Sequence, residues 1–276
     1  QQVSDFSVNL GKYLGAKQVI TCGNGTDALQ IALMALGLQV GDEVIVPCFG
    51  YVAAVEVIAL LKLKPVMIEV DPDTFMVTGE TFKNAITSKT RAIIPIHLFG
   101  QCADMEQVMK IASDHNIFVI EDTAQAIGAD FTFSDGTVKK AGTIGHIGCT
   151  SFFPSKNLGC FGDGGAIYTD NEALGVTLKM IANHGQTKKY HHAIIGLNSR
   201  LDTIQAGILG VKLKYIDAYI SARQRAAAAY DEGFKGLGWL QIPKRLKSST
   251  HVFHQYTLKL RGDINREEFR NYLTEK

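Results

Sequence analysis

One lysine stands where an amine could act as a nucleophile. Lys156 lies in the stretch SFFPSKNLG at 151–159, which follows an apolar run and leads into the glycine-rich residues 162–165. A solvent-exposed lysine is the ordinary interpretation of such a position. A buried amine beside cationic groups has a lowered pKa, however, and attacks carbonyl carbon atoms. The glycines that follow indicate a tight loop around this side chain.

Three further stretches carry polar or aromatic residues directly after apolar runs. Residues 23–27 (GNGTD) offer two glycines and a helix start, which favour an anion site or, equally, a tight turn capped by Thr26 or Asp27. Asp122 ends an apolar run, so its carboxylate could hold a metal, a ribose or a protonated ring nitrogen, or could cap a helix. Tyr51, in an aromatic-rich loop, could stack on a planar ligand or pack in the core.

Each of these signals is weak alone, but together they describe the needs of one cofactor. A phosphate cradle, an acid for a pyridine nitrogen, an aromatic stacking residue and a reactive lysine are what pyridoxal 5′-phosphate requires. The sequence therefore predicts a pyridoxal-phosphate site. We expect no metal site, because the five cysteines are widely spaced and the adjacent His191 and His192 cannot share a helix face.

The elements that must position these residues alternate along the chain. Short apolar runs, expected as strands, lie at 19–22, 43–47, 65–70, 91–96, 117–121, 147–153 and 165–169. Segments with helical spacing lie between them, at 27–36, 52–61, 79–86 and 105–115. This alternation predicts an α/β fold with a mainly parallel seven-stranded sheet flanked by helices. Ligands then bind beyond the carboxyl ends of the strands.

The pattern changes near residue 200. Residues 202–237 read as one long helical stretch, followed by a strand at 258–260 and a helix at 265–273. We expect a large cofactor-binding domain over 1–220 and, over 221–276, a connecting helix and the start of a smaller α+β C-terminal domain.

Composition excludes several classes of protein. With 28 Lys+Arg against 27 Asp+Glu, the net charge is +1. The chain therefore lacks the excess of basic residues that is typical of nucleic-acid-binding proteins. No apolar run is long enough for a transmembrane helix, and residues 1–10 do not read as a signal peptide. The cysteines are expected as buried thiols in a reducing compartment, which predicts a cytoplasmic protein.

Six ordered motifs resemble those of the DegT/StrS sugar-nucleotide aminotransferases, within the aspartate aminotransferase superfamily. They are GNGTDAL at 23–29, GDEVIVP at 41–47, PIHLFGQ at 95–101, EDTAQA at 121–126, the lysine loop at 151–165 and NSRLDTIQA at 198–206. The resemblance covers essentially the whole chain. One departure is Gly50-Tyr51, where many relatives have Thr-Phe.

The resemblance implies a role for each matching position. Lys156 holds the cofactor and moves the proton, Asp122 pairs with the ring nitrogen, and Gln125 contacts the side of the ring that carries the 3-hydroxyl. Tyr51 stacks on the ring. The phosphate contacts fall on Gly25, Thr26, the backbone of Asp27, Ser151 and, from the neighbouring subunit, Asn198. The substrate contacts fall on His184 and, across the same interface, on Arg200.

The resemblance also implies the reaction and the partners. An amino acid, expected to be glutamate, gives its amine to a keto group of a UDP- or dTDP-linked sugar, in making amino sugars for surface polysaccharide or related glycans. A homodimer with shared active sites is implied. The alternatives are a pyridoxal-phosphate sugar dehydratase and a non-catalytic regulatory member of the same fold. Relatives extend beyond both ends of this chain, so we expect a piece of a longer enzyme.

Overall fold

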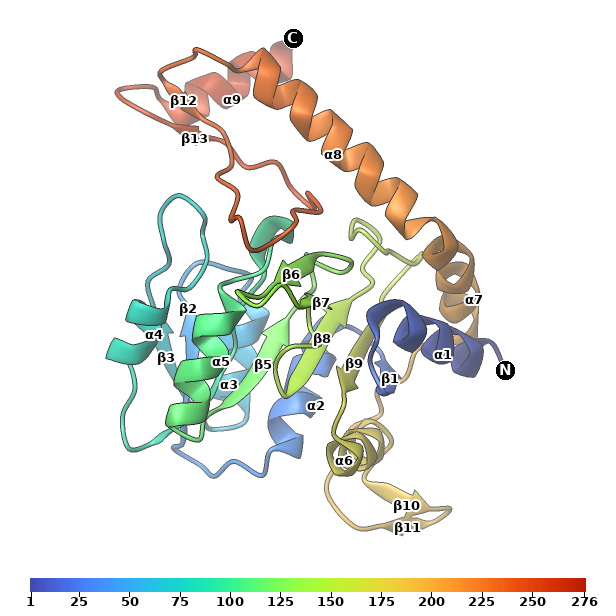
Figure 1. Ribbon diagram of the computed structural model, residues 1–276. Coiled ribbons are helices and arrows are strands. Elements are labelled where there is room, and N and C mark those ends of the chain that lie inside the picture. Colours follow the sequence, from blue (N-terminus) through green and yellow to red (C-terminus); the bar gives the residue numbers. More distant parts are fainter.

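The computed structural model describes residues 1–276 and contains one seven-stranded sheet (Figure 1). Its strand order is β1-β9-β8-β5-β4-β2-β3. The strands are β1 (Gln18–Cys22), β2 (Glu43–Pro47), β3 (Lys64–Ile68), β4 (Thr90–Ile93), β5 (Phe118–Asp122), β8 (Ile147–Ser151) and β9 (Gly165–Thr169). The pairings from β8 to β3 are parallel, and β9 is antiparallel to both of its neighbours. The predicted mainly parallel seven-stranded sheet is confirmed.

Helices cover the sheet and explain its unbroken apolar strands. They are α1 (Gln2–Leu14), α2 (Gly25–Ala35), α3 (Ala53–Leu60), α4 (Gly79–Asn84), α5 (Met105–Asp114) and α6 (Glu172–Ala182), with a short 3-10 turn, η1 (Leu98–Gly100). Helix α2 packs on the sheet and also contacts α3 and α6, whereas α5 packs on β5 with α4 beside it. Every residue of β2 and β9 is buried, as expected for strands covered on both faces.

The chain after residue 200 differs from the expectation of one continuous helix. It forms α7 (Thr203–Lys212), a 3-10 turn η2 (Leu213–Tyr215) and α8 (Ile216–Gly233). Leu213 and Ile216 are buried, so the turn is stabilised by packing, which a helix-propensity argument does not include. Helix α8 leads away from the sheet to β12 (Leu240–Gln241), β13 (Lys259–Leu260) and α9 (Arg266–Glu275) (Figure 1). The domain boundary at residue 220 stays a prediction.

Several elements were not foreseen. Helix α1 buries Phe6, Leu10 and Leu14, and α6 buries Leu178 and Ile181. Two polar hairpins were also missed because they lack apolar alternation. They consist of β6 (Asp130–Thr132) with β7 (Val138–Lys140), and β10 (Gln186–Lys188) with β11 (His191–His192).

Four cysteines are buried free thiols, as expected, but Cys48 is exposed, so the prediction of burial is wrong there. Cys48 directly follows β2, in the loop that leads to α3. None of the helices combines the length and the apolar character needed to cross a membrane.

Candidate active site

The lysine and the buried acid meet at the carboxyl edge of the sheet. Asp122 is the last residue of β5, and Lys156 lies in the loop after β8, which pairs directly with β5. Burial raises the pKa of Asp122, while the N–H of Ala124, 3.0 Å from Oδ1, and the charge of Lys156 act against this rise. Burial also lowers the pKa of Lys156, and the charge of Asp122 opposes that shift. The two side chains therefore influence each other, as neighbours at one site.

Asp122 carries an oxygen with no partner in the chain. Only Oδ1 accepts a hydrogen bond, from Ala124, and the side chain does not cap a helix. The residue is 9% exposed. A nearly buried carboxylate with one free oxygen is complementary to a cationic N–H group.

The glycine loop, residues 23–27, leads into the start of α2 and lies against β8. Asn24, not Thr26 or Asp27, caps the helix, because its Oδ1 accepts from the N–H of Asp27 at 2.8 Å. The amide groups of Gly25 and Thr26 have no acceptor within the helix and none elsewhere in the chain. These free N–H groups at a helix start suit an anion.

Gly25 allows the glycine loop to approach Ser151 closely. A Cβ atom on Gly25 would lie 2.7 Å from the Cβ of Ser151. The Ser151 hydroxyl accepts a long hydrogen bond from the N–H of Phe153 at 3.3 Å, which leaves its own proton available. Ser151 and the free amides of the first turn therefore form one cradle.

Gln125 and Tyr51 differ in how firmly they are held. The Oε1 of Gln125 accepts from the N–H of Phe99 at 2.7 Å, so its amide NH₂ is the group left for a ligand. Tyr51, by contrast, is 71% exposed in the loop after β2, with its ring free to meet a planar group. This exposure excludes packing of Tyr51 in the core of the chain, while its stacking on a ligand stays a prediction.

The segment 198–200 lies beside the glycine loop. Ser199 is buried, accepts from the N–H of Gly23 at 2.9 Å and donates to the Asp27 carboxylate at 2.6 Å. Its neighbours Asn198 and Arg200 are exposed. His184 is placed elsewhere, at the end of α6, where its carbonyl oxygen lies 2.9 Å from Nδ1 of His192. No hydrogen bond or ion pair joins His184 to Lys156 or Asp122.

Sequence reasoning missed two residues beside Lys156. The Nδ2 of Asn157 donates to the carbonyl of Val252 at 2.9 Å, while its Oδ1 is buried without a partner. The Nδ1 of His254 is likewise buried and unpartnered. Burial, Lys156 and Arg223 lower the pKa of His254 to about 4. No sequence signal could have paired these segments, because 95 residues separate Asn157 from Val252.

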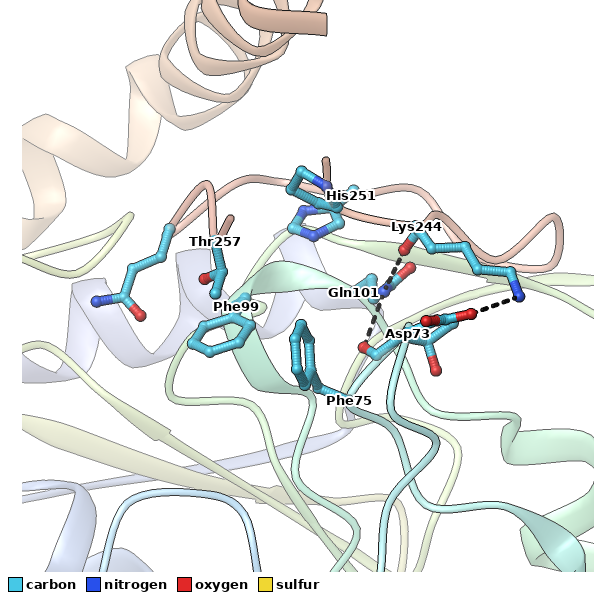
Figure 2. A pocket seen from close by; sticks show the side chains of 10 residues that line it. Asp73, Phe75, Phe99, Gln101, Lys244, His251 and Thr257 are labelled. Atoms are coloured by element: carbon cyan, nitrogen blue, oxygen red, sulfur yellow. Dashed lines mark hydrogen bonds and ion pairs between the residues drawn. The ribbon is translucent and has the colours of Figure 1, made fainter. Parts of the chain in front are cut away.

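The chain returning from α8 closes over this edge of the sheet. Figure 2 shows the contact, where Gln101 donates to the carbonyls of Thr74 and Lys244 and an ion pair joins Lys244 to Asp73. The cavity there has a volume of about 10 Å³. That volume is enough for one water molecule and far too small for a cofactor. The cavity in Figure 2 is therefore not the cofactor site.

Comparison with known proteins gives a consistent result. The model of the DegT/DnrJ/EryC1/StrS aminotransferase family matches residues 1–276. A Pseudomonas aeruginosa protein described as UDP-2-acetamido-2-deoxy-3-oxo-D-glucuronate aminotransferase is 46% identical, over 94% of this chain and 70% of that protein. An Acidithiobacillus ferrooxidans protein described as a UDP-N-acetyl-3-dehydro-alpha-D-glucosamine 3-aminotransferase is 45% identical, over 89% of this chain and 65% of that protein.

A solved structure is similar over nearly the whole chain. It is NtdA from Bacillus subtilis with bound cofactor PMP, which is 32% identical with a TM-score of 0.88. The match covers 99% of this chain and 61% of that one.

Proposed function

Because the chain belongs to the DegT/DnrJ/EryC1/StrS aminotransferase family, we propose that it transfers an amino group from an amino acid to a keto sugar linked to a nucleotide. Both relatives described above carry UDP-sugars with an oxidised carbon 3 in their names. We therefore favour a UDP-linked 3-oxo sugar over a dTDP-linked one, with glutamate as the donor. The observation that carries the proposal is the placement of Lys156 and the buried Asp122 at the carboxyl ends of the adjacent strands β8 and β5.

The residues at this edge fit pyridoxal 5′-phosphate. The free oxygen of Asp122 suits a protonated ring nitrogen, and the cradle of Gly25, Thr26 and Ser151 suits a phosphate dianion. A Cβ on Gly25 would fill part of this cradle. Lys156 supplies the amine that would hold the carbonyl carbon of the cofactor. When bound, the cofactor would supply an electron sink for carbanion chemistry.

Asp122 and Lys156 would have different roles in the proposed reaction. Asp122 would keep the ring nitrogen protonated, because its carboxylate is otherwise poorly compensated for burial. The lowered pKa of Lys156 increases the fraction of free amine near neutral pH, so its Nζ can accept a proton and return it to another carbon. Both half-reactions would use this one amine, which predicts ping-pong kinetics.

The hydrogen bonds within the chain also support a narrower set of groups that would contact the cofactor. The Oε1 of Gln125 is occupied by Phe99, so Nε2 would face the 3-hydroxyl oxygen. The N–H of Asp27 is occupied by Asn24, so the phosphate contacts would fall on the amides of Gly25 and Thr26. Tyr51 would cover the ring and exclude water from one of its faces.

We also propose a homodimer in the cytoplasm, with each site completed by a second copy. Asn198 and Arg200 are exposed on either side of the buried Ser199, as groups that reach a neighbouring chain would be. Mixing Lys156→Ala chains with Arg200→Ala chains tests this directly. Partial recovery of activity in the mixture supports shared sites, whereas two inactive variants that stay inactive together argue against them.

The experiment that tests the proposed function supplies glutamate and a UDP-linked 3-oxo sugar and measures 2-oxoglutarate. Formation of 2-oxoglutarate only when the keto sugar is present is the expected result, with synthesis of amino sugars for surface glycans as the proposed purpose. Loss of a sugar hydroxyl without transfer of nitrogen would indicate a dehydratase. Cofactor binding without turnover of any keto sugar would indicate a regulatory protein.

A further inference from the structure

The side chain of His97 has no role in the mechanism above, yet its segment, PIHLFGQ at 95–101, runs beside the acid. Ile96 pairs in parallel with Asp122 beyond the end of β4. The N–H of Asp122 donates to the carbonyl of Pro95, and the N–H of His97 donates to the carbonyl of Asp122, both at 3.0 Å. Two backbone hydrogen bonds from this segment thus hold the residue that carries the carboxylate.

The ring of His97 is fixed at both of its nitrogen atoms. The side chain is fully buried, Nδ1 accepts from the N–H of Ala103 at 3.2 Å, and Nε2 lies 2.8 Å from Oε2 of Glu121. Since Nδ1 accepts, the proton is on Nε2 and is donated to Glu121. Turning the ring would leave buried polar groups without hydrogen-bond partners, which is unfavourable.

Glu121 anchors this ring to a second loop. Its Oε2 accepts from Gly142 at 2.8 Å, and its Oε1 accepts from Ile144 at 2.7 Å and from Gly145 at 2.5 Å. Successive side chains of a strand point to opposite faces. The anchor of Glu121 on one face of β5 therefore determines how Asp122 is presented on the other.

The same segment also holds Gln125. Phe99 adopts a φ of 61°, in the left-handed region, and its N–H donates to Gln125. Backbone strain of this kind persists only where the surrounding structure imposes it. Residues 95–101 thus support both side chains of the EDTAQA motif that would face the cofactor ring.

We propose that His97 is the positioning residue of Asp122, holding through Ala103 and Glu121 the backbone from which the carboxylate reaches the cofactor ring nitrogen. This inference rests on the proposed function, which assigns Asp122 to that nitrogen. His97 does not touch the cofactor itself and acts only through Asp122.

The test compares three variants in the whole chain. His97→Leu removes both ring contacts, and His97→Gln keeps a donor near the position of Nε2 and so should rescue the contact with Glu121. His115→Gln, at an exposed histidine after α5, is the matched control. Two readouts are taken: the dissociation constant of pyridoxal phosphate, and the titration of the Asp122 carboxyl carbon by NMR without cofactor.

In His97→Leu we expect the cofactor dissociation constant to rise roughly tenfold, as for other supporting residues behind a ligand site. The Asp122 titration should also move to lower pH, because a loosened strand end admits water and reduces the effect of burial. His97→Gln and His115→Gln should remain near the native values. Should His97→Leu fail to fold, His97→Asn retains an acceptor for Ala103 and takes its place.

A His97→Leu chain that is only less stable, with native cofactor affinity and a native Asp122 titration, overturns the proposal. Failure of the native chain to bind pyridoxal phosphate would refute the proposed function instead. The Asp122 titration, which needs no cofactor, would still decide whether His97 positions the acid.

Discussion

Replacing Gly25 with alanine would put a methyl group where the glycine loop has no room for it. The new Cβ would lie 2.7 Å from Cβ and 3.3 Å from Cα of Ser151, whose backbone belongs to β8. An ordinary contact begins near 3.4 Å, so the loop or the strand must move by about 0.7 Å (3.4 − 2.7). Overpacking of this kind costs about 1–3 kcal/mol.

The displacement should weaken cofactor binding more than it weakens the fold. The Gly25 and Thr26 amides must both reach the phosphate, and a hydrogen bond to a charged group contributes about 1.5–3 kcal/mol. Losing one such bond raises the dissociation constant by about 10- to 100-fold. Titration of the purified variant with pyridoxal phosphate, followed in the visible absorption, measures this change.

Gly210→Ala is the matched control, because nothing lies within 4 Å of a Cβ at that helical position. It should leave cofactor affinity unchanged and raise the free energy of unfolding by up to about 1 kcal/mol. If Gly25→Ala bound pyridoxal phosphate as tightly as the native chain, the assignment of the phosphate to this loop would be refuted.

Further perturbations test the acid and the pH dependence. Asp122→Asn cannot stabilise a protonated ring nitrogen, so the rate of 2-oxoglutarate formation should fall by about 100-fold or more, whereas Asp114→Asn, at the exposed end of α5, should have no effect. Native activity in Asp122→Asn would exclude the proposed role. Burial lowers the pKa values of His251 to about 3 and of His254 to about 4. Between pH 6.5 and 4 the unfolded chain therefore binds protons that the folded chain does not. The free energy of unfolding should fall as the pH is lowered, by at most about 1.4 kcal/mol per pH unit for each histidine and by less for the partly exposed His254. Urea unfolding of native and His254→Gln chains measures this slope, and an identical slope in both would contradict the shift of His254.

The fold was predictable where the chain repeats a simple pattern. Strand β2 and helix α2 follow directly from apolar runs and helical spacing, and their bounds agree within two residues. The turn η2 was not predictable, because no glycine or proline marks it and packing of Leu213 decides it. The polar hairpin of β10 and β11 has no buried side to give it a pattern.

The candidate site was predictable only where its residues follow strands in short motifs. Asp122 ends β5 and Lys156 follows β8, so their shared place at the carboxyl edge of the sheet could be inferred from the strand ends. The sequence could not show that Asn24, and not Thr26, caps helix α2, because that depends on the backbone geometry. His254 lies near Lys156 only because the chain returns toward the sheet after α8. No local sequence pattern predicts a contact between segments so far apart in the chain.

The central claim is that Lys156 carries the cofactor, and reductive trapping tests it most directly. The native chain is incubated with pyridoxal phosphate, treated with borohydride, digested and mapped by mass spectrometry. We expect the stable adduct on Lys156 and no adduct on exposed lysines such as Lys179 at low cofactor concentration. An adduct spread over surface lysines, with Lys156 unmodified, would contradict the assignment.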